Sequence, residues 1–205
     1  MFFLIGVIVI LFLTVGCSSS KINTRSDIEP ARHNQAQKAV SSSRSINPED
    51  ENRYKKALGM MQAGDYQQAY DLFKQVADDN PDISGPFINM GIISLKQDNN
   101  LQAESHFQQA IRLKSDNAEV YNYLGIAYRQ QGRFSDANIA YKKALNLDDT
   151  MAKTYLNIGI LNDLYLGDYL EAQKNYKKYQ ELNPDNKKVN AWLQDLNSRI
   201  QASAE

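Results

Sequence analysis

Reactive residues are scarce in this 205-residue sequence, which contains one cysteine and two histidines. A single cysteine excludes an internal disulfide and a zinc site built from several cysteines. Neither His33 nor His106 has a second candidate ligand three or four residues further on, so we expect no metal site. Glycine-rich phosphate loops and a Gly-x-Ser-x-Gly motif are also missing from the sequence. We therefore expect neither an enzyme nor a bound cofactor.

The sequence also lacks an excess of charge of either sign. It has 23 Lys and Arg against 24 Asp and Glu, for a net charge of −1. Binding to nucleic acid draws on a surplus of basic residues, so no nucleic-acid partner is expected. The hydrophobic share of 42% is too high for a wholly disordered chain. The length suits one globular domain with an additional segment.

The additional segment lies at the N-terminus, where residues 1–16 carry no charged side chain. A helix of this length measures about 22 Å, which is shorter than the roughly 30 Å of a bilayer core. A cleaved signal peptide is therefore predicted. The alternative is an uncleaved N-terminal anchor in which Cys17 has no role.

The only cysteine follows the apolar segment directly, with Gly16 before Cys17 and three serines after it. This arrangement resembles the lipobox of bacterial lipoproteins. The resemblance implies that Cys17 becomes the first residue of the mature protein and carries fatty acids such as palmitate. Because Ser18 rather than Asp follows the cysteine, the resemblance also implies the periplasmic face of the outer membrane.

Residues 17–46 contain few large apolar side chains and two serine triplets, so they are predicted to form a flexible linker. A flexible chain of about 30 residues has a mean end-to-end distance near 30 Å. A short helix over residues 30–40 is the alternative for part of this segment. Asn47 and Pro48 then form a typical helix start, with an N-cap side chain followed by proline at the first helical position.

A period of 34 residues organises the rest of the chain, beginning with Gly91, Gly125 and Gly159. Small and aromatic residues recur in register with the glycines, as Ala69, Ala103, Ala137 and Ala172, each followed four positions later by Phe73, Phe107, Tyr141 and Tyr176. Each period is predicted to hold two amphipathic helices joined by a tight turn. The small residues would let the two helices approach while the rings fill the gaps beside them.

This pattern resembles the tetratricopeptide repeat (TPR) family. The resemblance implies an all-α fold, an α-solenoid of four TPR helix pairs with a C-terminal capping helix. The four units are assigned within residues 47–186, as 50–83, 84–117, 118–151 and 152–186, and the fourth has one extra residue in its turn. Residues 187–201 place an apolar stripe on one helix face, formed by Val189, Trp192, Leu193, Leu196 and Ile200. This helix is predicted to cap the last repeat, with partner binding as the alternative.

By the same resemblance, the first helix of each unit lines a concave groove that binds peptides. The corresponding positions here are Tyr54, Leu58, Ile88, Asn89, Ile92, Asn122, Tyr123, Ile126, Leu156, Asn157 and Ile160. We call Leu58, Ile92, Ile126 and Ile160, which are spaced 34 apart, the aliphatic ladder. Tyr54 and Leu58 replace the Lys and Asn of repeats that clamp a carboxylate, although Asn89 matches one clamp position. An apolar ligand such as an amphipathic helix is predicted. The alternative is that these side chains only pack between neighbouring first helices.

Together these features predict a non-catalytic, lipid-anchored scaffold that binds protein or peptide segments in the bacterial envelope. Lipoproteins of this repeat family serve pilus, outer-membrane, wall and TonB-like systems, which defines the expected range of machines. The alternative is a structural homo-oligomer whose groove is filled by a sister chain or by its own N-terminal segment.

Overall fold

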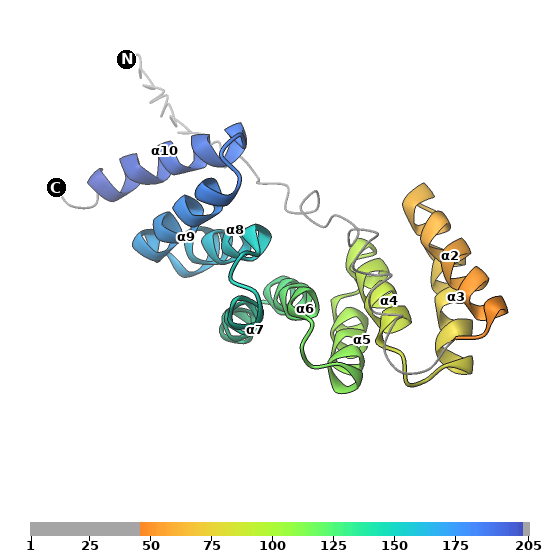
Figure 1. The fold of residues 1–205 in the computed structure, drawn as a ribbon. Coiled ribbons are helices and arrows are strands. Elements are labelled where there is room, and N and C mark those ends of the chain that lie inside the picture. Colours follow the sequence, from red (N-terminus) through yellow and green to blue (C-terminus); the bar gives the residue numbers. More distant parts are fainter. Residues whose placement is uncertain (1–45, 203–205) are drawn as a thin grey trace, which may run out of the picture.

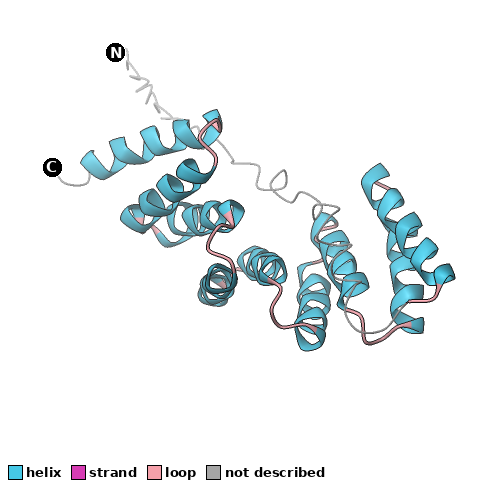
Figure 2. Ribbon diagram, in the orientation of Figure 1, coloured by secondary structure: helices cyan, strands magenta, loops and turns pink. Residues whose placement is uncertain are grey.

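The computed structural model describes residues 46–202. Within this range the chain forms nine α-helices, one π-helical turn and no β-strand (Figure 2). The helices are α2 (Pro48–Ala63), α3 (Tyr66–Asp79), α4 (Ser84–Lys96), α5 (Asn100–Leu113), α6 (Ala118–Gln130), α7 (Phe134–Leu147), α8 (Ala152–Leu161), α9 (Tyr169–Leu182) and α10 (Lys187–Ala202), with the π-helical turn η2 (Asn162–Leu166) between α8 and α9.

Consecutive helices pack as four antiparallel pairs, α2 with α3, α4 with α5, α6 with α7, and α8 with α9. The second helix of each of the first three pairs also contacts the first helix of the next pair. The pairs follow one another along an arc, with α2 at one end and α10 at the other (Figure 1). The predicted all-α solenoid of four helix pairs with a terminal helix is confirmed. The signal peptide, Cys17 and all but the last residue of the linker lie outside the described residues.

The first helix begins at the predicted position. The Asn47 side chain accepts a hydrogen bond of 2.9 Å from the backbone N–H of Asp50, and Pro48 occupies the first turn. The buried Asp50 carboxylate accepts hydrogen bonds from Arg53 at 2.6 Å and from the Asn80 amide at 2.8 Å. Since Asn80 follows α3, these contacts join the start of the first helix to the end of the second.

Helix pairs approach closely at the repeated glycines. A Cβ atom added to Gly91 would lie 2.5 Å from the Phe107 ring, and one added to Gly125 would lie 2.4 Å from the Tyr141 ring. Gly159 and Tyr176 repeat the same contact at 2.4 Å. All three rings are fully buried. The close packing predicted from the period of 34 is confirmed, because no side chain fits between helix and ring.

The last helix covers the end of the solenoid. Val189, Leu193 and Leu196 of α10 are buried in one apolar cluster with residues of α8 and α9. Trp192 packs beside Tyr176 at a centroid distance of 5.8 Å. The predicted capping role of this helix is confirmed.

Candidate protein-binding site

The aliphatic ladder lies inside the protein. The exposed fractions of its four side chains are between 0 and 6%. Leu58, Ile92 and Ile126 belong to an apolar core that extends from the first repeat into the fourth, and Ile160 belongs to the cluster beneath α10. This burial does not fit the prediction that the ladder faces an open groove and favours the packing alternative, while partner binding at these residues stays a prediction.

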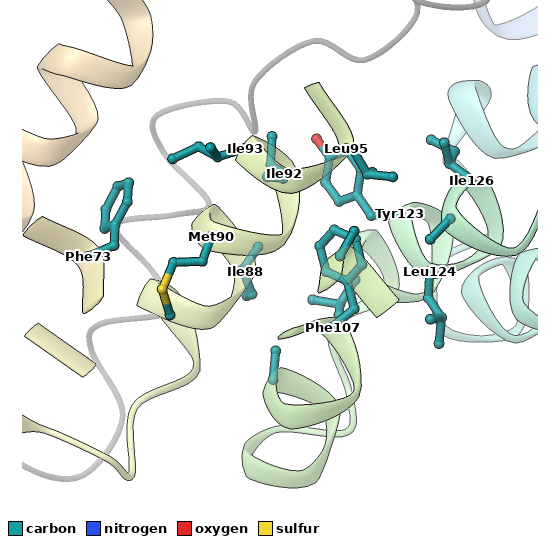
Figure 3. Close-up of a cluster of buried hydrophobic side chains, with 14 of the residues drawn as sticks. Phe73, Ile88, Met90, Ile92, Ile93, Leu95, Phe107, Tyr123, Leu124 and Ile126 are labelled. Carbon is teal, nitrogen blue, oxygen red and sulfur yellow. The ribbon is translucent and has the colours of Figure 1, made fainter. Parts of the chain in front are cut away.

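Direct contact between neighbouring first helices accompanies this burial. Helix α4 contacts α6, and α6 contacts α8. In Figure 3 the rings of Phe107 and Tyr123 lie between Ile88 on one side and Leu124 on the other, and their centroids are 5.7 Å apart in a stacked arrangement. The sequence period shows that Ile92 and Ile126 share equivalent helix faces. It does not show that the adjacent repeat covers those faces.

The polar residues of the predicted groove bind one another across the repeats. The Asn89 amide donates to the Tyr54 hydroxyl at 2.7 Å, and the Asn157 amide donates to the Asn122 carbonyl oxygen at 3.0 Å. Burial raises the pKa of Tyr54, while the hydrogen bond from Asn89 opposes that shift. Ile88 and Tyr123 are also buried, so Leu156 is the single predicted groove residue that keeps intermediate exposure. These two polar pairs thus join neighbouring first helices.

Exposed apolar side chains gather instead at the turn of the fourth repeat. Leu164, Tyr165, Leu166 and Leu170 have exposed fractions between 42 and 68%, and we call them the apolar turn. The corresponding turns of the other repeats are polar, with Gly64-Asp65, Asp98-Asn99 and Gly132-Arg133. The fold therefore does not require apolar residues there. The sequence analysis gave this surface no role in binding. The feature that could have indicated it is the extra residue in the turn of the fourth unit.

The extra residue is accommodated in the π-helical turn η2, which ends where Gly167 adopts a φ of +68°. The widened turn places Asp163 inside the protein and the three residues after it at the surface. Asp163 forms an ion pair of 2.7 Å with Arg199 of α10 and accepts a hydrogen bond of 3.3 Å from the Tyr176 hydroxyl. Single π-turns of this kind are frequent at functional sites.

A buried arginine lies beneath the apolar turn. Arg129, at the end of α6, is 3% exposed and donates from Nε to the Tyr141 hydroxyl at 3.4 Å and from Nη1 to the Tyr165 hydroxyl at 3.5 Å. The Tyr165 ring lies 5.7 Å from the guanidinium carbon and packs on Phe134 at 4.9 Å. Burial lowers the pKa of Arg129, but the hydroxyls of Tyr141 and Tyr165 raise it, and the net shift is upward. The guanidinium therefore stays charged.

Other chemistry is not evident in the described part of the chain. Residues 46–202 contain no group of three or more His, Cys, Asp or Glu side chains placed to hold a metal ion. None of the helices in this range is both long enough and apolar enough to span a bilayer.

The fold defines a class, the α-helical repeat solenoids. Models of the tetratricopeptide repeat match residues 51–82, 82–150 and 152–186. The chain belongs to the tetratricopeptide repeat family.

Solved structures show the same architecture. PilF of Pseudomonas aeruginosa is 18% identical, with a TM-score of 0.68 over 82% of this chain and 72% of its own. MamA is 23% identical, with a TM-score of 0.61 over 73% of this chain and 85% of its own. The TPR domain of Arabidopsis OM64 is 25% identical, with a TM-score of 0.54 over 56% of this chain and 94% of its own. These similarities are similarities of fold.

Proposed function

We propose that this protein is a lipid-anchored, non-catalytic scaffold that holds protein partners of a bacterial envelope machine. TPR domains serve as scaffolds for protein–protein interaction, and one similar structure, the first TPR domain of Spaghetti (RPAP3), is bound to an HSP90 peptide. The observation that carries the proposal here is the apolar turn. Its turn exposes Leu164, Tyr165 and Leu166, where the turns of the three other repeats carry polar residues, and Leu170 extends this surface onto α9.

The size of the apolar turn sets the strength of binding to expect. Burying an exposed leucine side chain gains about 1.5–3 kcal/mol, whereas association costs roughly 4–15 kcal/mol. Four partly exposed residues therefore support weak binding on their own. Additional contacts, or several copies held on one membrane, would bring the affinity into the micromolar range or below.

Anchoring depends on Cys17, the only cysteine and the residue directly after the apolar leader. The Cys17→Ala variant is expected to incorporate no labelled palmitate and to keep the leader uncleaved. Metabolic labelling followed by electrophoresis measures both effects. Labelling of the variant, or the absence of label in the unmodified protein, would contradict lipid anchoring.

Partner binding is tested by two leucines at equivalent helix positions. Leu170 and Leu101 are each the second residue of the second helix of a repeat, and both are strongly exposed. Aspartate in a first helical turn is favourable, so Leu170→Asp and Leu101→Asp should both fold. We expect the amount of partner protein crosslinked in whole cells to fall at least tenfold for Leu170→Asp and to stay unchanged for Leu101→Asp. Equal yields from the two variants would contradict the role of the apolar turn.

The alternative is the homo-oligomer whose groove is filled by a sister chain or by its own N-terminal segment. Light scattering of the full chain at several concentrations distinguishes the two functions. A scaffold for other proteins should show a concentration-independent mass, whereas a homo-oligomer should not.

A further inference from the structure

Arg129 has an unusual set of partners for a buried cation. A charged group in a low-dielectric interior is costly unless a countercharge accompanies it. Among residues 46–202, no carboxylate lies within ion-pair distance of Arg129. Its side-chain partners are the hydroxyls of Tyr141 and Tyr165, at 3.4 and 3.5 Å. Distances this long mark weak hydrogen bonds.

The acids of the adjoining repeat are already engaged. Asp163 is buried, with one oxygen bound to Arg199 at 2.7 Å and the other to the Tyr176 hydroxyl at 3.3 Å. Asp195 also pairs with Arg199, at 2.9 Å. Neither acid compensates Arg129. A guanidinium carries five N–H donors, and within residues 46–202 those of Arg129 are matched by two weak tyrosine contacts.

The three polar groups also have hydrogen-bond capacity left over. Each tyrosine hydroxyl accepts from Arg129 and keeps its own proton to donate. Burial raises the pKa of Tyr141, so that hydroxyl stays protonated. Tyr165 is 42% exposed and belongs to the π-helical turn, so it connects the buried guanidinium to the surface. An acceptor arriving beside Tyr165 would meet the Tyr165 hydroxyl and the Nη1 end of Arg129, while the fully buried Tyr141 hydroxyl holds Nε.

We propose that Arg129 and Tyr165 bind a single carboxylate of a partner protein, with Tyr141 holding the guanidinium in place and Leu164 and Leu166 contacting the apolar residue next to that carboxylate. Guanidinium and carboxylate form strong, geometrically matched hydrogen bonds. The carboxylate would replace the weak contact between Arg129 and Tyr165. The inference rests on the proposed function, because it describes what the apolar turn of a scaffold binds.

A carboxylate fits this position better than a phosphate. The buried Asp163 lies in the next repeat, and both its charge and that of Arg129 influence the Tyr176 hydroxyl. A dianionic phosphate would meet about twice the repulsion from that fixed carboxylate that a singly charged carboxylate ligand meets. The single positive charge of Arg129, which has no carboxylate partner among residues 46–202, is neutralised by a single negative charge on the ligand. Apolar side chains on both sides of Tyr165 favour a ligand whose anionic group adjoins an apolar one.

The test uses the full chain in detergent micelles with 15N-labelled arginine. N-acetyl-leucine serves as the probe, N-acetyl-leucinamide as its neutral match, and inorganic phosphate as the alternative anion. We expect a saturable shift of the Arg129 Nε–H signal with N-acetyl-leucine, and at least tenfold weaker binding of the amide and of phosphate. Equal binding of acid and amide, tighter binding of phosphate, or no saturable shift would overturn the proposal.

Variants separate binding from folding. Arg129→Met removes the unpaired charge at similar length, so we expect a melting temperature equal to or above that of the original chain, with probe binding lost. Arg112→Met, at an exposed arginine of α5, should keep the saturable shift of the Arg129 Nε–H signal. Probe binding to Arg129→Met and to Tyr165→Phe is followed in uniformly 15N-labelled protein, through the backbone amide signals of the apolar turn. If Arg129→Met does not fold, Tyr165→Phe removes one hydroxyl and should weaken binding severalfold. Unchanged probe binding in either folded site variant would overturn the proposal.

This experiment can fail independently of the proposed function. If Leu170→Asp and Leu101→Asp capture equal amounts of partner while N-acetyl-leucine still binds, only the role of the apolar turn in the proposed function is contradicted. Partner capture that depends on Leu170 without binding of N-acetyl-leucine would contradict the carboxylate site alone.

Discussion

Gly125 and Tyr141 show how strictly single positions are constrained in this protein. The glycine has no side chain because the Tyr141 ring occupies the space where a Cβ atom would lie. Gly91 and Gly159 stand in the same relation to Phe107 and Tyr176. A glycine in mid-helix costs about 1 kcal/mol relative to alanine, so its recurrence every 34 residues requires a packing reason. The structure supplies that reason.

A pair of identical substitutions tests this constraint. Gly125→Ala should lower the free energy of unfolding by about 1–3 kcal/mol, since the new methyl group overlaps a buried ring. Gly59→Ala should raise it by up to about 1 kcal/mol, because Gly59 lies on an exposed helix face with no neighbouring atom within 4 Å. Urea unfolding measures both values. Changes of the same sign would contradict the assigned packing.

At the scale of elements, the π-helical turn distinguishes the fourth repeat from the others. It directs Asp163 toward α10 and exposes Leu164 and Leu166. The same turn therefore both pairs with the terminal helix and carries the exposed apolar residues. The helix pairs were predictable because small and aromatic residues recur in register. The π-turn was not, since a longer loop would have absorbed the extra residue equally well.

The attachment of α10 can be tested with two acids that bind the same arginine. Asp163→Asn should lower the free energy of unfolding by about 1–3 kcal/mol and speed hydrogen exchange in α10. The reason is that it replaces the buried ion pair with Arg199 by a weaker hydrogen bond. Asp195→Asn should change stability by less than about 0.5 kcal/mol, since Asp195 is 70% exposed. Equal exchange rates in the two variants would show that the π-turn does not hold α10.

At the scale of the whole molecule, the two ends of the solenoid have different roles in the proposed function. The predicted linker enters at α2, whereas the apolar turn lies in the fourth repeat, near the other end of the arc (Figure 1). A lipid anchor at Cys17 would thus hold the membrane-proximal end and leave the fourth repeat available to partners. Residue patterns predict the repeats themselves, because each repeat is a local unit.

Exposure of the predicted groove could not be read from the sequence in the same way. Leu58 and Ile92 occupy equivalent helix faces whether or not a neighbouring helix covers them. That coverage depends on how far each repeat rotates relative to the last, and on contacts such as the one between α4 and α6. The sequence therefore predicts the ladder as a row of equivalent residues, whereas its burial depends on tertiary packing that the repeat pattern does not specify.

The free energy of unfolding of the Ile126→Lys variant tests the central claim most directly, with Leu166→Lys as the matched control. Ile126 is 3% exposed, so a lysine there buries an unpaired charge and should cost at least about 3 kcal/mol. Leu166 is 47% exposed, and the same substitution should cost less than about 0.5 kcal/mol. A stable Ile126→Lys variant would instead show that the ladder lines an open groove, and would return partner binding to the first helices.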